Sequence, residues 1–363
     1  MSEKDNALHV KKGVEPPDNI NPLLLQGHFM SKKKERTVDE YVAGILQKDK
    51  IILSQAITLI ESTVTEHQQK AQEIIAKCLP FANKSIRIGI TGTPGVGKST
   101  FIEAFGQYVI EQGKRVAVLA IDPSSQVSRG SILGDKTRMQ YLAVREEAFI
   151  RPSPAGDSLG GVARKTRETI ILCEAAGFDT IIIETVGVGQ SEVAVHSMVD
   201  FFLLLLLPGA GDELQSIKRG IVEMADMIAI NKADDDRILA AKQARTTSQN
   251  ALRLFPLKES QWLAQALVCS ALSKLGIDEI WQQITDYQHF TKENNYFFKH
   301  RQGQSKFWLQ ESIQNELQRF FYENNEVKKL LPELEKAVEE GSVTSFQAAK
   351  ELISIFKNTI KKL

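Results

Sequence analysis

The chain has 363 residues, which is long enough to bury a large core, and its 45 Lys and Arg residues balance 45 Asp and Glu residues. A net charge of zero argues against a nucleic-acid binder and against a protein that binds anionic membranes through bulk electrostatics. The three cysteines are far apart in sequence and form no CxxC motif, so they indicate small buried side chains in a reducing compartment.

The N-terminal segment, residues 1–35, is polar and contains Pro16, Pro17 and Pro22, which predicts a mobile arm. It has no secretory pattern, and acidic residues with no Arg before Arg36 argue against a mitochondrial presequence, so we expect a cytoplasmic protein. In residues 36–84, apolar side chains recur at spacings of three and four from Tyr41 to Ile75, which predicts two or three helices.

Residues 85–290 alternate short β-prone runs with helical stretches, which predicts an α/β fold with a mostly parallel sheet covered by helices on both faces. The strands we expect are Arg87–Thr91, Val116–Ile121, Ala148–Pro152, Thr180–Glu184, Phe201–Leu207, Met227–Ile230 and Ala266–Cys269. The longest apolar run, Phe201–Leu207, is too short to span a bilayer, which needs about 20 residues. It fits a strand buried on both faces, and ligands of such sheets collect beyond the carboxyl ends of the strands.

A phosphate-binding loop follows the first of these strands. The segment GTPGVGKST has the pattern Gly, four residues, Gly-Lys-Ser, between a strand and a helix, and its glycines let backbone N–H groups turn toward phosphate oxygens. Lys98 supplies a positive charge to the β- and γ-phosphates, and the Ser99 hydroxyl is a ligand for Mg²⁺. The nucleotide-binding residues that we expect here are Gly92, Thr93, Pro94, Gly95, Val96, Gly97, Lys98, Ser99 and Thr100.

Carboxylates stand at the ends of two of the expected strands, the second and the fourth. Asp122 comes after Val116–Ile121, and Glu184 ends the strand Thr180–Glu184. Phosphoryl transfer needs positioning and charge neutralisation, so we expect Mg²⁺ to be held by Ser99, Asp122, Asp135 and Glu184. Each carboxylate also has an ordinary structural interpretation as a helix cap or a surface ion pair.

Two glycine-rich segments have the character of nucleotide-responsive loops. In the first, Gly187 is placed to turn a backbone N–H toward a γ-phosphate, and Val188 stands where a water-positioning Gln would be expected, which predicts slow intrinsic turnover raised by a partner. The second begins at Pro208, and its candidate switch residues are Gly209, Gly211, Asp212, Glu213 and Lys218. We assign the reaction itself to Lys98, Asp122, Gly187 and Lys218.

The base is indicated by an N-K-x-D set, Asn231-Lys232-Ala233-Asp234, after the strand Met227–Ile230. The Asp234 carboxylate can accept from both N1–H and the N2 amino group of guanine, donors that adenine lacks on that edge. The last strand leads into Ser270, Ala271 and Leu272, whose backbone N–H groups we expect at guanine O6. GTP and GDP are therefore the predicted ligands.

Residues 291–363 are predicted to form a C-terminal helical arm that turns helical from Phe307. Trp308, Ile313, Leu317, Phe320 and Phe321 form an apolar stripe, Gly341 closes a helix over Val327–Glu340, and Thr344 with Gln347 forms a capping box for the last helix. The arm either packs back on the core or pairs with a second copy. We expect a homodimer, because such apolar helical surfaces favour obligate interfaces.

Together these motifs resemble the MeaB/ArgK family of GTPases associated with methylmalonyl-CoA mutase. The resemblance covers about residues 37–363 and includes GTPGVGKS, AIDPSS, GSILGDKTRM, ETVGVGQSE, NKAD and LLPELEKAVEEG. It implies a SIMIBI-class core that gates cobalamin delivery to an acyl-CoA mutase, protects that mutase, and is stimulated by it. It also implies a metal role for Asp122, Asp135 and Glu184, and a partner-responsive switch over residues 209–218.

Two other functions are compatible with parts of the sequence. A small-molecule kinase of the arginine or ornithine transport type would use Arg129, Lys136 and Arg138 to hold a second substrate, but no dedicated acceptor pocket is evident. A nickel-insertion GTPase would need Cys and His clusters near the site, and the six histidines are scattered.

Overall fold

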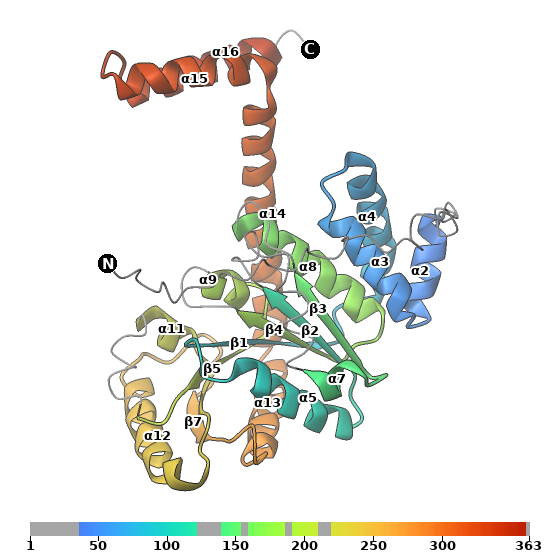
Figure 1. Cartoon of the computed structure of the whole chain (residues 1–363), viewed down its shortest axis with the longest axis vertical. Helices are drawn as coiled ribbons and strands as arrows, with labels where there is room; N and C mark the ends of the chain where they lie inside the picture. The colour runs from blue at the N-terminus through green and yellow to red at the C-terminus, as the bar shows by residue number, and fades with distance from the viewer. Residues whose placement is uncertain (1–35, 122–138, 154–158, 186–190, 210–218, 361–363) are drawn as a thin grey trace, which may run out of the picture.

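The computed structural model describes residues 36–121, 139–153, 159–185, 191–209 and 219–360. Its centre is a sheet in which every neighbouring pair of strands is parallel, in the order β3-β2-β4-β1-β5-β6-β7 (Figure 1). The strands are β1 (Ile86–Gly92), β2 (Val116–Ile121), β3 (Ala148–Ser153), β4 (Thr180–Thr185), β5 (Phe201–Leu206), β6 (Met227–Ile230) and β7 (Gln265–Val268). The predicted α/β fold is confirmed, and each predicted strand is present with ends that differ by at most one residue.

Helices cover both faces of the sheet, and this explains the continuous apolar strands. One face packs against α5 (Lys98–Glu111), α7 (Gln140–Ala143) and α13 (Ile277–Glu293). The other face packs against α8 (Leu159–Ala175), α9 (Ser191–His196), α11 (Arg219–Met224) and α12 (Ile238–Leu252). Strand β1 lies in the middle between β4 and β5, and every residue in it is buried.

The N-terminal segment forms α2 (Val38–Leu46), α3 (Lys50–Glu61) and α4 (Thr65–Cys78). The sequence predicts two or three helices here, and the structure has three α-helices among residues 36–84. Thr37 and Glu40 form a capping box at the start of α2, and Asp49 accepts from the N–H groups of Ile51 and Ile52 at the start of α3. The three helices pack mainly against α8 (Figure 1), and α3 also contacts the edge strand β3, where Arg151 donates to Ser54 Oγ at 3.2 Å and to Glu61 Oε1 at 3.3 Å.

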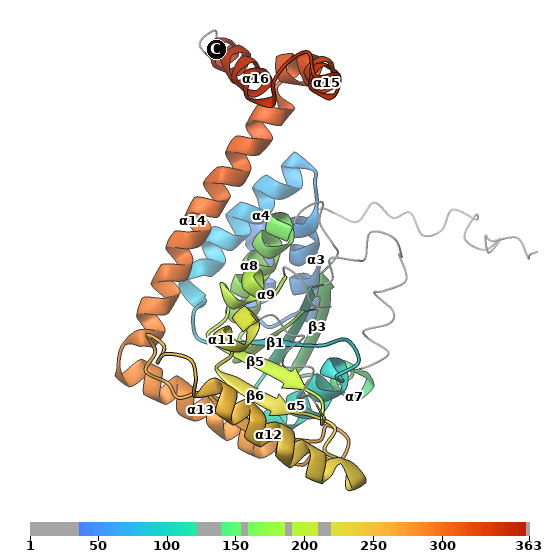
Figure 2. The same cartoon turned by 90° about the vertical axis from the view of Figure 1, so that its left-hand side faces the viewer.

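The C-terminal segment is a long helix that leaves the core and carries a helical hairpin at its far end (Figure 2). It consists of α14 (Tyr296–Glu323), α15 (Asn325–Glu339) and α16 (Ser345–Ile360). The prediction that helix resumes at Phe307 was wrong, because α14 already begins at Tyr296. Asn295, with φ +62°, separates α14 from α13. The closure at Gly341, with φ +72°, and the capping box of Thr344 and Gln347 are confirmed.

The residues of the predicted apolar stripe on this helix lie in three different environments. Trp308 is buried against the core, whereas Ile313, Leu317 and Phe320 are at least half exposed. Phe321 packs on a small core shared by α15 and α16. In the described ranges, no helix has both the length and the apolar character that crossing a membrane requires. The four predicted domain limits remain predictions.

Two glycines give a matched test of packing. An added Cβ at Gly89 in β1 would lie 2.8 Å from Phe202 and 3.0 Å from Val195, whereas one at Gly303 in α14 would meet nothing within 4 Å. We expect Gly89→Ala to lower the free energy of unfolding by about 1–3 kcal/mol through overpacking. Gly303→Ala should raise it by up to about 1 kcal/mol, because alanine is the better helix former. Urea unfolding of both variants measures this, and equal effects would contradict the packing of α9 on β1.

Candidate nucleotide site

The phosphate-loop segment connects β1 to α5 in a conformation that requires glycine. A Cβ at Gly92 would lie 2.5 Å from the carbonyl oxygen of Leu205. Gly97, just before α5, has φ +90°, and a Cβ there would lie 3.1 Å from the side-chain nitrogen of Asn231. The loop therefore lies close to the ends of β5 and β6, and α5 begins at Lys98 with its N-terminus toward the loop.

Lys98 folds back over this loop. Its Nζ donates to the carbonyl oxygens of Gly92 at 2.8 Å and Thr93 at 3.4 Å. Burial lowers the pKa of Lys98, while the nearby carboxylates of Glu184 and Glu192 act in the opposite direction. A cation held by neutral carbonyl groups is available to a stronger anionic acceptor.

Two of the predicted metal ligands come together. The Ser99 hydroxyl donates to Glu184 Oε1 at 3.2 Å, and Glu184 is buried near the end of β4. A hydroxyl beside a carboxylate is the hard oxygen donor set that suits Mg²⁺. Asp122, Asp135 and Gly187 lie outside the described residues, as do Arg129, Lys136 and Arg138.

The N-K-x-D set is hydrogen-bonded directly to the phosphate loop. Asn231 is buried, and its Nδ2 donates to the carbonyl oxygen of Val96 at 2.9 Å across 135 positions of sequence. Lys232 Nζ donates to the carbonyl oxygen of Gly95 at 2.7 Å. The two motifs thus form one site at the carboxyl ends of β1 and β6.

Asp234 is oriented by the segment after β7. The Ser270 hydroxyl donates to Asp234 Oδ1 and accepts from the N–H of Ser273 at 3.1 Å. Within the described ranges, no hydrogen bond is made by the other carboxylate oxygen, Oδ2. Asp234 is therefore held in one orientation with an oxygen left for a ligand.

The backbone of residues 270–272 is partly committed to the fold. The N–H of Ser270 donates to the carbonyl oxygen of Leu275 at 3.0 Å, and the N–H of Ala271 donates to Asn231 Oδ1 at 3.2 Å. Leu272 is 76% exposed. These contacts hold the segment beside Asn231, and contact of its N–H groups with guanine O6 stays a prediction.

Of the predicted switch residues, Gly209 is described and has φ +88° with open space at its Cβ position. Gly211, Asp212, Glu213 and Lys218 lie outside the described residues. One residue without a predicted role is close to the site: Glu192 in α9 is 1% exposed and acts electrostatically on Lys98. Its signal in the sequence was an acidic residue at the start of a short helix after a glycine-rich segment.

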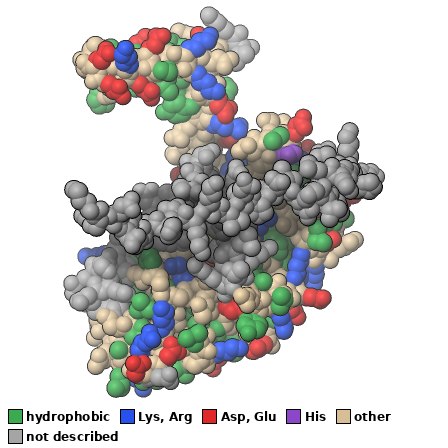
Figure 3. All heavy atoms as spheres, viewed as in Figure 1, with side chains coloured by type: hydrophobic (Ala, Val, Ile, Leu, Met, Phe, Trp, Pro, Cys, Tyr) green, Lys and Arg blue, Asp and Glu red, His purple; other side chains and the backbone are tan. Residues whose placement is uncertain are grey.

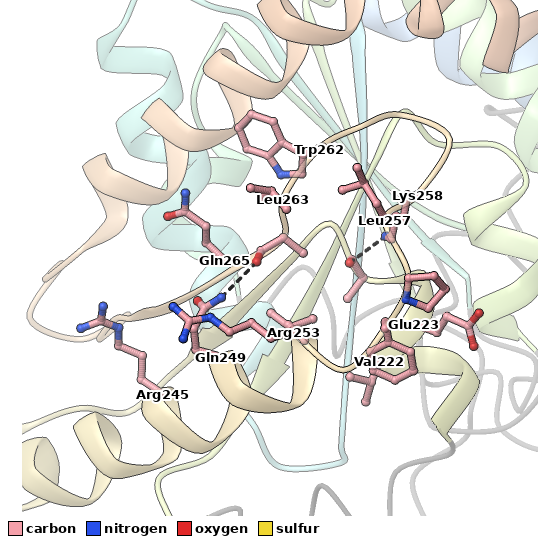
Figure 4. Close-up of a pocket in the computed structure, with 15 residues that line it drawn as sticks. Val222, Glu223, Arg245, Gln249, Arg253, Leu257, Lys258, Trp262, Leu263 and Gln265 are labelled. Atoms are coloured by element: carbon pink, nitrogen blue, oxygen red, sulfur yellow. Dashed lines mark hydrogen bonds between the residues drawn. The ribbon is translucent and has the colours of Figure 1, made fainter.

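A separate hollow of about 600 Å³ lies at the opposite edge of the sheet (Figure 4). It is lined by Val222, Arg245, Gln249, Leu263 and Gln265, among others, and Gln249 donates to the carbonyl oxygen of Ala264 beside it. Gln265 begins β7, whereas the phosphate loop follows the end of a parallel strand, so this hollow is not part of the nucleotide site.

Residues 53–326 match the family described as "Methylmalonyl Co-A mutase-associated GTPase MeaB". The chain belongs to the MeaB family. This confirms the resemblance found in the motifs and identifies the protein as a GTPase of a GTP-binding family.

Individual relatives agree with this assignment. GTPase ArgK of Escherichia coli is 43% identical over 318 residues, which cover 88% of this chain and 96% of that protein. The mouse protein "Methylmalonic aciduria type A homolog, mitochondrial" is 42% identical over 339 residues, covering 91% of this chain and 82% of that protein. A solved structure described as "LAO/AO transport system kinase" has a TM-score of 0.70 and 36% identity, covering 89% of this chain and 99% of that one.

Proposed function

We propose that this MeaB-family GTPase binds GTP on residues 92–100, with guanine at Asp234, and that it uses GTP hydrolysis to act as a chaperone of a cobalamin-dependent acyl-CoA mutase. In that role it gates cobalamin loading and protects the mutase, which in turn raises a low intrinsic rate of hydrolysis. The observation that carries the nucleotide site is the pair of contacts from Asn231 and Lys232 to the carbonyl oxygens of Val96 and Gly95. A phosphate-binding loop and a guanine-reading motif joined in this way fix the two ends of one nucleotide.

The described residues supply most of what phosphoryl transfer requires. Lys98 moves its charge from the loop carbonyls to the phosphates, and the N-terminus of α5 faces the same anion. Ser99 and Glu184, together with the predicted ligands Asp122 and Asp135, would hold Mg²⁺, which supplies charge neutralisation on the phosphates when bound. Gly187 and Lys218 remain proposed contributors from the two loops.

The mutase is proposed as partner because the family description names methylmalonyl-CoA mutase. The test mixes the purified full-length chain with purified methylmalonyl-CoA mutase and measures phosphate release from GTP. We expect the mutase to raise kcat by about tenfold or more, since a group supplied by a partner raises kcat of other GTPases by about 10³- to 10⁵-fold. We also expect cobalamin transfer to the mutase to depend on GTP; unchanged rates of both would contradict the proposal.

A small-molecule kinase is the alternative, because the solved relative is described as a transport-system kinase. The discriminating assay incubates the chain with GTP and arginine or ornithine and looks for a phosphorylated amino acid. We expect phosphate release without such a product. A stoichiometric phosphoamino acid would favour the kinase.

We also propose a homodimer formed through the arm. Leu309, Ile313 and Leu317 recur every four residues along α14 and are 62%, 50% and 61% exposed, and Phe346 at the start of α16 is 86% exposed. An apolar row of this kind is suited to a second copy. Apolar side chains are also visible on the surface of the hairpin of α15 and α16 (Figure 3). Cytoplasmic location remains a prediction.

Ending the chain after Trp308 tests the dimer while keeping the buried part of α14. We expect the full-length protein to be a dimer and the shortened protein a monomer, as measured by light scattering coupled to size exclusion. A shortened protein that remains dimeric would place the interface elsewhere.

A further inference from the structure

Helix α14 holds the turn that connects α9 to β5, residues 197–200. Gln304 Nε2 donates to the carbonyl oxygen of Val199 at 2.7 Å, and Trp308 Nε1 donates to the carbonyl oxygen of Ser197 at 3.1 Å. His300 Nε2 lies 3.3 Å from the same Val199 oxygen. The three side chains are spaced four residues apart, so they share one face of the helix.

The same turn is hydrogen-bonded to β1, the strand that leads into the phosphate loop. Arg301 of α14 donates to both carboxylate oxygens of Asp200, at 2.7 and 2.6 Å, and Asp200 Oδ2 also accepts from the backbone N–H of Arg87 in β1 at 2.8 Å. Burial acts to raise the pKa of Asp200, but Arg301 and Arg87 lower it below its usual value, so this carboxylate stays ionised. The start of α14, the turn and β1 therefore form one rigid unit.

Helix α9 lies between this turn and the phosphate loop. A Cβ at Gly89 of β1 would be 3.0 Å from Val195 and 3.1 Å from Val199, so α9 packs directly on the strand that carries the loop. Glu192 in the first turn of α9 is buried, and its negative charge acts to raise the pKa of Lys98. A helix of six residues thus has Lys98 near one end and the α14 contacts at the other.

We propose that Gln304 and Trp308 are positioning residues for the GTPase reaction. By fixing residues 197–200 they set the position of α9, and with it Glu192, relative to Lys98. A change of bound nucleotide that displaces α9 must then alter the contacts on α14, the helix that carries the hairpin of α15 and α16. The proposal rests on the proposed placement of GTP on residues 92–100.

Buried donors and acceptors make this arrangement sensitive to small substitutions. Gln304 and Trp308 are 6% and 8% exposed, so their hydrogen bonds to the turn are shielded from water, and removing either donor weakens the hold on the turn. Gln304→Glu keeps the side-chain shape and replaces the donor by an oxygen. Gln302 is exposed on the same helix, so Gln302→Glu is the matched control for the added charge.

The experiment uses the full-length chain labelled with 5-fluorotryptophan, because its three tryptophans give three ¹⁹F signals. Trp308→Phe assigns the signal of Trp308. We expect this signal to differ between the GDP complex and the complex with a non-hydrolysable GTP analogue. The difference should shrink in Gln304→Glu and persist in Gln302→Glu.

Kinetics provide the second readout. Displacement of groups around the reacting phosphates lowers turnover more than binding, so Gln304→Glu and Trp308→Phe should lower kcat about tenfold while KM for GTP changes by less than about threefold. Calorimetric stoichiometry for GTP in each variant shows that the site is folded. Gln304→Met, which removes the donor without adding charge, replaces Gln304→Glu if that variant does not fold.

The outcomes separate this inference from the proposed function. A Trp308 signal that is the same in both complexes, with normal calorimetric binding of both nucleotides, overturns the inference and leaves the nucleotide site intact. Absence of nucleotide binding to the unmodified chain overturns the proposed function and the inference with it.

Discussion

Replacing Lys98 with alanine will lower the affinity for GTP by about 100-fold, because charge-assisted hydrogen bonds to phosphate contribute about 1.5–3 kcal/mol each and Lys98 is placed to make more than one. The side chain is already held at the loop by the carbonyl oxygens of Gly92 and Thr93, so only its ammonium group has to move onto the phosphates. Little reorganisation is then needed when phosphates bind.

Isothermal titration calorimetry with GTP measures this effect. Lys114→Ala is the matched control, because Lys114 is exposed beyond the far end of α5 and should leave the affinity unchanged. Equal affinities of the Lys98 variant and the unmodified protein would show that the phosphates bind elsewhere.

The features that could be predicted from sequence are those fixed by local chemistry. The strands were found because helices cover both faces of the sheet, which leaves continuous apolar runs such as Phe201–Leu206. The capping box of Thr344 and Gln347 and the closure at Gly341 depend only on neighbouring residues. The strand and helix around residues 92–100 could also be predicted, because they too depend on the local sequence.

Contacts between distant segments could not be predicted in this way. The bond from Asn231 to Val96 depends on β1 and β6 ending at the same edge, with β5 between them. The start of α14 at Tyr296 was missed because its first turns are stabilised by contacts with distant segments, such as that of Arg301 with Asp200. Glu192 had no predicted role because its proximity to Lys98 arises from the packing of α9 on β1.

The structure adds a side-chain contact to the segment after β7. Contact of its backbone with guanine stays a prediction, and the backbone N–H groups of Ser270 and Ala271 donate to Leu275 and Asn231. The Ser270 side chain orients Asp234. In the proposed site the base is read chiefly by this carboxylate, so we expect a single substitution to alter base recognition.

Asp234→Asn changes that carboxylate into an amide of the same shape, which replaces an acceptor by a donor. Guanine then loses a partner for its N1–H and N2 amino donors, whereas xanthine presents a carbonyl oxygen in place of the amino group. Each buried group left unpaired costs about 1–3 kcal/mol, so the preference for GTP over XTP should fall by about 100-fold. Asp236→Asn is the control, because Asp236 is exposed two residues away.

The most direct test of the account is therefore the ratio of GTP to XTP affinities, measured by calorimetry for the unmodified chain and for Asp234→Asn. We predict strong preference for GTP in the unmodified protein and its loss or reversal in the variant. A variant that prefers GTP to the original degree would contradict the assignment of guanine to Asp234.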